Sequence, residues 1–188
     1  MNIWISSDFH FDHTNISGPK VSRWKSGFRT FNNISEMNDN LFNSINNKVK
    51  EDDILYFLGD FCFGGHQNTP KHRSRILCKN IHFLRGNHDD NIDLYKEHFT
   101  SINDVLNIRH GKMKYFMSHY SHRVWPGSHK GTIHLYGHSH GSIPDFGKSM
   151  DVGVDAAFKV YGEYRPFHID EINKIMEKKQ QEIVDHHE

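Results

Sequence analysis

The sequence predicts a layered α/β domain, because short apolar segments alternate with amphipathic segments along the chain. Each apolar segment is bounded by polar residues or glycine, as is typical of buried strands. These segments are residues 2–5, 53–58, 80–84 and 132–136. A chain of 188 residues fits one domain of ordinary size, so we expect a single domain over residues 1–188.

Helical patterns lie between and after these strands. Residues 35–49 carry apolar side chains at intervals of four, which predicts an amphipathic helix. Residues 69–80 and 91–99 predict two further helices. The chain should end in an exposed, charge-rich helix at about 170–183, followed by a polar tail over residues 184–188.

An antiparallel element joins the alternating pattern. Residues 102–109 and 112–119 flank the dipeptide at 110–111, which is typical of a two-residue hairpin connection. Residues 165–169 predict a last edge strand, because Pro166 is tolerated near the start of such a strand. The sheet content is therefore mixed rather than purely parallel.

Composition limits the partners that the chain can have. Lys plus Arg and Asp plus Glu both number 23, so there is no global basic field, and nucleic acid is expected only as a substrate. No apolar stretch reaches the roughly 18 residues of a membrane span, which predicts a protein without membrane contact. Cys62 and Cys78 lack the dense spacing of a disulfide framework, which indicates a cytoplasmic protein. Its oligomeric state is left open.

Carboxylate, amide and imidazole side chains, which can bind metal ions or transfer protons, follow five of the apolar segments. In α/β sheets, ligands bind beyond the carboxyl ends of the strands, so we expect these side chains to converge. They are Asp8 and His10 after the first segment, Asp60 after the second, Asn87, His88 and Asp89 after the third, His119 after the hairpin, and His138 and His140 after the next segment. These nitrogen and oxygen donors outnumber what one ion can use and fit two ions of Mn²⁺, Fe, Ni²⁺ or Zn²⁺.

In order and approximate spacing, these groups resemble the sequence blocks of the calcineurin-like metallophosphoesterase family. The resemblance extends from residue 8 to residue 140, and the opening SDFHFDHTNI is similar to that of small bacterial and phage members. It implies a fold of two mixed β-sheets packed as a sandwich and flanked by helices. It also implies two divalent metal ions, with Mn²⁺ favoured: Asp8, His10 and His140 hold one metal, Asn87, His119 and His138 hold the second, and Asp60 bridges both.

The function that this resemblance implies is dinuclear, metal-dependent hydrolysis of phosphate esters. A hydroxide bridging the metals attacks phosphorus, and His88, held by the carboxylate of Asp89, gives a proton to the leaving oxygen. The alternative for His88 is a hydrogen bond to phosphate or to a metal ligand. A phosphodiester or a nucleotide-like substrate is favoured. The alternatives are a phosphomonoesterase or nucleotidase on the same centre, or a non-catalytic metal-binding scaffold.

Four residues are candidates for contact with the substrate. Asn87 is a candidate both for substrate contact and for metal binding. His13 either touches the substrate or orders its loop. Arg29 and Arg123 either contact phosphate or are solvated surface charges.

Three aspartates close to the motifs match no metal-ligand position. Asp12 is expected to be an exposed or capping group. Asp151 and Asp155 either accept hydrogen bonds from ligand imidazoles or are plain turn residues.

Overall fold

The computed structural model describes residues 1–184, and it contains two mixed β-sheets. Residues 185–188 of the predicted polar tail lie outside the described residues. In the first sheet the strand order is β4-β3-β2-β1-β9, and only the edge strand β9 runs antiparallel to its neighbour. These strands are β1 (Ile3–Ser6), β2 (Ile54–Phe57), β3 (Asn80–Leu84), β4 (Ser101–Asn103) and β9 (Phe167–His168).

The second sheet has the order β5-β6-β7-β8. Its strands are β5 (Val105–His110), β6 (Met113–Ser118), β7 (Ile133–Tyr136) and β8 (Ser149–Asp151). Strands β5 and β6 form the predicted antiparallel hairpin, and the other neighbours are parallel. His110 pairs with Met113, so the connection is Gly111–Lys112, one residue later than predicted. The left-handed backbone of Gly111 (φ 58°) explains this shift, since tight hairpin turns need such a residue.

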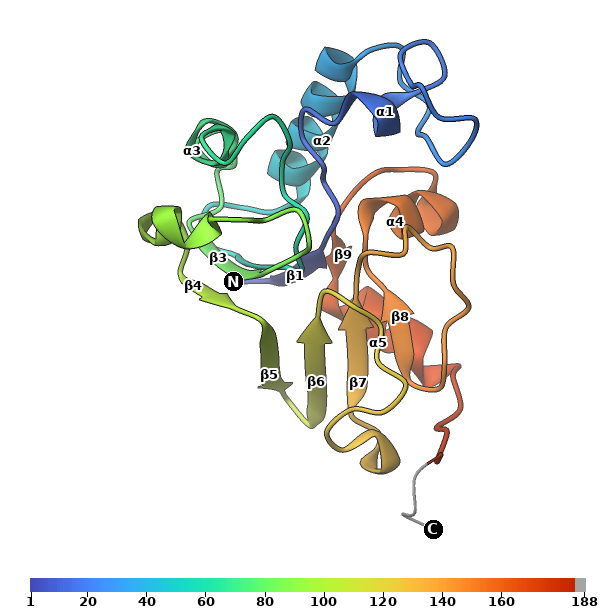
Figure 1. The fold of residues 1–188 in the computed structure, drawn as a ribbon. Helices are drawn as coiled ribbons and strands as arrows, with labels where there is room; N and C mark the ends of the chain where they lie inside the picture. Colours follow the sequence, from blue (N-terminus) through green and yellow to red (C-terminus); the bar gives the residue numbers. More distant parts are fainter. Residues whose placement is uncertain (185–188) are drawn as a thin grey trace.

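Helices cover the first sheet on one side, and the second sheet packs against its other side (Figure 1). The helical elements are α1 (Thr14–Ser17), α2 (Ile34–Lys48), α3 (Asn68–Arg73), the 3₁₀ segments η1 (Ile92–His98) and η2 (Ser128–Lys130), α4 (Val154–Tyr161) and α5 (Ile169–Glu177). None of those within residues 1–184 is both long and apolar enough to cross a membrane.

The core consists of two apolar layers on opposite faces of the first sheet. Leu55 and Phe57 of β2 join the layer beneath α2, whereas Tyr56 joins the layer between the two sheets. This is the alternation that the pleat of a strand imposes. On the second sheet, Tyr115 and Leu135 complete the inner layer.

The predicted helices are present but shorter at their C-terminal ends. The helix predicted at 69–80 ends at Arg73, whose guanidinium donates to the carbonyls of Ile76 and Cys78 and holds the following residues in turns. These turns bury Cys78 completely in the core. The helix predicted at 91–99 is the 3₁₀ segment η1, and the last helix, α5, ends at Glu177 rather than near residue 183.

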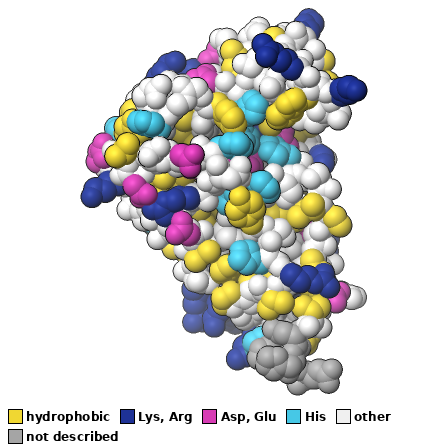
Figure 2. Space-filling model, in the orientation of Figure 1, with side chains coloured by type: hydrophobic (Ala, Val, Ile, Leu, Met, Phe, Trp, Pro, Cys, Tyr) yellow, Lys and Arg dark blue, Asp and Glu magenta, His cyan; other side chains and the backbone are white. Residues whose placement is uncertain are grey.

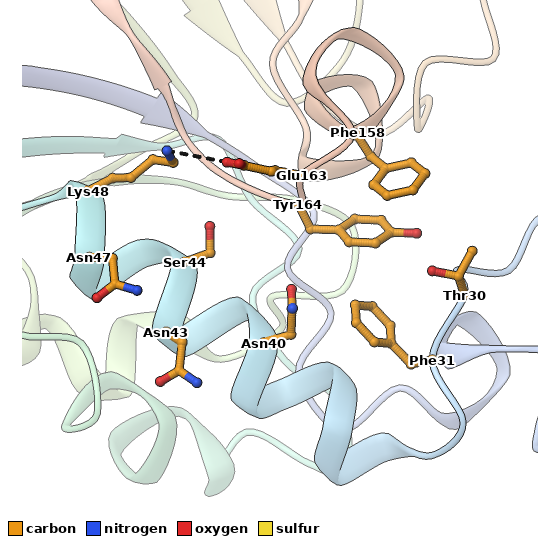
Figure 3. A pocket seen from close by; sticks show the side chains of 11 residues that line it. Thr30, Phe31, Asn40, Asn43, Ser44, Asn47, Lys48, Phe158, Glu163 and Tyr164 are labelled. Carbon is orange, nitrogen blue, oxygen red and sulfur yellow. Dashed lines mark ion pairs between the residues drawn. The ribbon is translucent and has the colours of Figure 1, made fainter.

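A polar groove lies between α2 and the segment that follows α4 (Figure 3). Asn40, Asn43 and Asn47 of α2 line one wall, and the ion pair between Lys48 and Glu163 spans it with an N–O distance of 3.3 Å. The groove has a volume of about 460 Å³. None of the predicted site residues lines it, so the candidate site lies elsewhere.

Candidate metal centre

The loops that leave β1, β2, β6 and β7 meet at one edge of the two sheets. The amide of Asp8 donates to the carbonyl of Gly59 (2.9 Å), and the amide of Gly137 donates to the carbonyl of His119 (2.9 Å). His138 and Asp8 connect the two sheets, since the amide of His138 donates to the Asp8 carboxylate at 3.0 and 3.1 Å. Figure 2 shows several histidine side chains gathered near the middle of the face above the second sheet.

The first group of donors is Asp8, His10 and His140, whose ligand atoms all lie within 4.8 Å of one another. Nε2 of His10 lies 3.3 Å from Nε2 of His140 and 3.8 Å from Oδ1 of Asp8. Nδ1 of His140 is 2.6 Å from Oδ2 of Asp155, to which it donates, so its Nε2 carries a lone pair directed at this space. Three donors therefore converge on one point.

The second group is Asp60, His119 and His138, whose ligand atoms meet the same limit of 4.8 Å. Oδ1 of Asn87 lies 3.1 Å from Nε2 of His119. Oδ2 of Asp60 lies 3.5 Å from Nε2 of His119 and also 3.5 Å from Nε2 of His10 in the first group. One carboxylate oxygen thus stands between the two groups, and all seven predicted ligands gather around it.

Burial and mutual charge shift the pKa values of these donors. Burial raises the pKa of Asp8 to about 7. Burial would also raise the pKa of Asp60, but the imidazoles of His119 and His10 lower it to about 2. Burial lowers the pKa of His10 well below its ordinary value, and no residue in 1–184 bonds its buried Nδ1. Buried carboxylates and imidazole nitrogens that face one space, with no thiolate among them, fit a divalent metal.

The backbone is strained at five of the seven predicted ligands. Each adopts the left-handed region, which costs a non-glycine residue about 1–3 kcal/mol. The φ values are 59° at Asp8, 50° at His10, 61° at Asp60, 67° at His138 and 50° at His140. Strain of this kind persists where surrounding contacts hold it, and it concentrates at functional sites.

Glycines before the ligands allow the loops to approach closely. A Cβ atom at Gly86 would lie 2.2 Å from Oδ1 of Asp60, and one at Gly137 would lie 2.3 Å from Oγ of Ser7. Neither separation is compatible with a side chain. The glycines that precede Asn87 and His138 are therefore needed to bring the two groups together.

Arg29 holds the loop that carries the first group. It was expected either to contact phosphate or to be a solvated surface charge, and both expectations are wrong. Its side chain is buried and forms two hydrogen bonds with Asp155, each 2.9 Å long. It also donates to the carbonyls of Asp8 (2.6 Å) and Phe9 (2.9 Å). Since Asp155 in turn accepts from His140, Arg29 positions two ligands without contacting the open space.

Asp89 also has a positioning role and not the catalytic one that we expected. It is buried, and its carboxylate accepts hydrogen bonds from the amides of Asp60 (2.7 Å), Phe61 (2.9 Å) and Gly86 (2.7 Å). These bonds tie the loop after β2 to the loop after β3. The carboxylate is thereby occupied and does not hold the imidazole of His88.

His88 is exposed at the rim of the centre. Its amide donates to Oδ1 of Asp60 (2.9 Å), and its ring centroid lies 5.6 Å from that of His10. The ring of Phe63, 4.6 Å away, packs beside it. A pocket of about 310 Å³, lined by Phe63, Asn87 and His88, adjoins the centre on this side.

The remaining candidates divide between the centre and the periphery. His13 lies beside the centre, with its ring centroid 5.6 Å from that of His10, and burial lowers its pKa to about 4. Arg123 is exposed and lies over the ring of Phe146 (3.7 Å), so its observed contact is with protein.

The other two aspartates brace the structure. Asp12 is half-buried and bonds Nε2 of His72 (2.6 Å) and the side chain of Asn38 (2.7 Å). Asp151 accepts from the amides of Gly141 and Gly153, each at 2.7 Å, so it is the turn residue of the two alternatives. Asp155 is the imidazole acceptor.

Sequence comparison identifies one clear relative. No protein-family model matches the chain. The chain is 30% identical over 184 residues to the uncharacterized protein MJ1445 of Methanocaldococcus jannaschii, an alignment that covers 94% of this chain and 92% of the relative.

Two solved structures share the fold. One is a protein of unknown function, AQ665 from Aquifex aeolicus, with a TM-score of 0.66, 21% identity and coverage of 93% of this chain and 98% of that one. The other is Yfce, a phosphoesterase from E. coli, with a TM-score of 0.51, 17% identity and coverage of 82% and 79%. The predicted fold of two mixed sheets flanked by helices is confirmed.

Proposed function

This chain belongs to the same family as the uncharacterized protein MJ1445, and we propose that it is a metal-dependent phosphoesterase. The observation that carries the proposal is the position of Asp60, whose Oδ2 atom lies 3.5 Å from a histidine nitrogen of each donor group. A pair of divalent cations that share one carboxylate needs an oxygen in this place. Asp8, His10 and His140 would hold one cation, and Asn87, His119 and His138 the other, with Mn²⁺ favoured over Fe, Ni²⁺ or Zn²⁺.

The charge balance of the centre suits an anionic ester. Asp8 and Asp60 offset only two of the four positive charges that two divalent cations bring, which leaves about plus two. The cations would draw the phosphoryl oxygens and supply a nucleophile from water at neutral pH. A chain with no net charge can therefore still bind a phosphate ester.

The chain's own side chains orient the ester and move the proton. Asn87 lies at the rim, where its amide can donate to a phosphoryl oxygen while its carbonyl oxygen faces the second group. An exposed ring N–H of His88 gives its proton to the leaving oxygen, which is the general-acid role. Phe63 packs beside His88 and positions the ring without carrying charge.

A diester with one negative charge is favoured over a dianionic monoester. The nearest guanidinium, that of Arg29, is buried and bonded to protein groups. The residues that line the pocket beside His88 include no Lys or Arg but include Asp89 and Asp90. A second negative charge on phosphate would gain little there. Monoester or nucleotidase activity, and a non-catalytic metal-binding scaffold, are the alternatives that the experiment below separates.

The test is hydrolysis of bis(p-nitrophenyl) phosphate and p-nitrophenyl phosphate by the full chain loaded with Mn²⁺. We expect faster turnover of the diester, complete loss on chelation, and a loss of at least about 10²-fold in Asp60→Asn. Asp52→Asn is the matched control, because Asp52 is exposed and its substitution should leave turnover unchanged. Full activity after exhaustive chelation, or in Asp60→Asn, would overturn the proposal.

A further inference from the structure

We propose that the loop of residues 18–30 and the rings beside it bind a single-stranded nucleic acid and deliver it to the metal centre. This inference rests on the proposed phosphoesterase function and names its substrate class. It starts from two features outside the donor groups: a row of aromatic rings that leads to His88, and two exposed cations on one loop that form no ion pair within residues 1–184.

The aromatic row runs from the loop to the rim of the metal centre. The ring of Trp24 lies 5.2 Å from that of His13, which lies 3.9 Å from Phe63, which lies 4.6 Å from His88. Trp24 meets His13 edge-on (76°), and no other ring of the described chain contacts its indole. With 45% of its surface exposed, Trp24 offers a platform on which a flat group can stack.

The loop around Trp24 is basic. The sequence has no acidic residue between Asp12 and Glu36. Arg23 and Lys25, on either side of Trp24, are exposed and form no ion pair with residues 1–184. Figure 2 shows dark-blue and yellow side chains beside histidines in the upper part of the molecule, over the loop that Figure 1 draws in blue.

The ends of the loop are fixed to the centre. The amide of Arg29 donates to the carbonyl of Ile16 (2.7 Å), and the amide of Phe31 donates to that of Ser17 (3.0 Å). The Arg29 side chain then bonds the carbonyl of Asp8, a predicted ligand. The loop that carries Trp24 is therefore closed at its base, and that base is bonded to the backbone of a predicted ligand.

An exposed ring between two exposed cations matches the chemistry of a single strand. Unpaired bases stack on aromatic side chains, and backbone phosphates bind the cations between them. A duplex keeps its bases stacked inside and cannot use Trp24 or Phe63 in this way. The row also leads past His88, so a strand lying on it would bring a phosphodiester to the proposed acid.

The test is binding of a phosphorothioate oligothymidylate, which resists hydrolysis, to the Mn²⁺-loaded full chain. In the wild type, tryptophan emission reports the contact at Trp24, because Trp125 is 5% exposed and Trp4 is partly buried with its N–H bonded to Asp53. Fluorescence anisotropy of an end-labelled oligothymidylate gives the Kd of every variant, including those that lack Trp24. We expect quenching on binding and a Kd raised by about 5- to 100-fold in Trp24→Ala. Trp24→Phe should restore most of the affinity, since a phenyl ring still stacks.

Salt dependence tests the cations separately. Arg23→Ala and Lys25→Ala should each reduce the slope of log Kd against log salt by about 0.7, the value for one phosphate contact on a single strand. Lys112→Ala is the matched control, because Lys112 is exposed on the hairpin connection at the other end of β6 from His119. Its slope should equal that of the wild type.

The outcomes separate this inference from the proposed function. Equal Kd values for wild type and Trp24→Ala, with hydrolysis of bis(p-nitrophenyl) phosphate by the wild type, would overturn the inference alone. No hydrolysis of that ester would overturn the proposed function, whatever the oligonucleotide does. Comparing the Kd of an oligouridylate with that of the oligothymidylate shows whether RNA or DNA binds more tightly. A duplex bound as tightly as the single strand would contradict the inference.

Discussion

Replacing Arg29 with methionine tests whether this buried guanidinium holds the first donor group in place. The substitution removes five polar contacts: two to Asp155, one each to the carbonyls of Asp8 and Phe9, and one to Sδ of Met37. It leaves the half-buried carboxylate of Asp155 with His140 as its remaining side-chain partner. Methionine fills much of the same volume, so the effect should come from lost charge and hydrogen bonds.

The expected cost is large compared with the stability of a domain. Removing one member of a buried ion pair costs about 3–5 kcal/mol, since the other charge is left uncompensated. For a chain of this size each kcal/mol lowers Tm by about 2–4 °C, so Tm should fall by about 6–20 °C. The Asp155 carboxylate that orients His140 is also no longer held by Arg29, which should weaken metal binding by about 10- to 100-fold.

Arg165→Met is the matched control for this experiment. Arg165 is also buried and forms a two-bond pair with a carboxylate, that of Glu171, at 2.8 and 3.0 Å, but it bonds no predicted ligand. Thermal unfolding followed by circular dichroism gives Tm, and titration calorimetry with Mn²⁺ gives the affinity. Both variants should unfold earlier, and only Arg29→Met should bind metal more weakly. A Tm within about 2 °C of wild type, or equal Mn²⁺ affinity in the two variants, would refute the positioning argument.

Two further predictions concern single histidines. His134 is fully buried and burial lowers its pKa to about 4, so between pH 6.5 and 4 the unfolded chain takes up a proton there that the folded chain does not. The free energy of unfolding should fall by up to about 3 kcal/mol as the pH drops through this window. Urea unfolding should show a weaker dependence on pH for His134→Gln than for the wild type. The same pH dependence in both proteins would contradict this prediction. His88→Ala should reduce hydrolysis of a dinucleotide by about 10²–10⁴-fold and of bis(p-nitrophenyl) phosphate by less than about tenfold, because nitrophenolate leaves without a proton. Equal losses on both esters would exclude the acid role.

Local sequence patterns were sufficient to predict the strands and the positions of the candidate metal ligands at the strand ends. Each predicted strand that carries a donor is present, with bounds that differ from the prediction by at most one residue. Helix lengths were predicted less well, because residues 74–79 are compatible with a helix locally and are turned inward by the contacts of Arg73. The strand predicted at 102–109 is divided between β4 and β5, and β8, α1 and α4 were not predicted. The elements β8 and α1 have too few residues to show a period.

The roles of charged residues depended on contacts between distant parts of the chain. Arg29 and Asp155 are 126 residues apart, and nothing near either one indicates that they pair. Asp89 stands next to His88 in sequence, yet its carboxylate turns to the amides of Asp60 and Phe61. Trp24 lies in a loop without periodicity, and only its distance to His13 relates it to the centre.

Sequence alone determined which donors stand at the ends of which strands, because alternation and turn residues act over a few positions. Only the tertiary structure decided which donors share a point, which carboxylates face the open space and which brace the loops behind it. The physical reason is burial: the folded core chooses which partner satisfies each polar group, and those partners come from segments far apart in the chain.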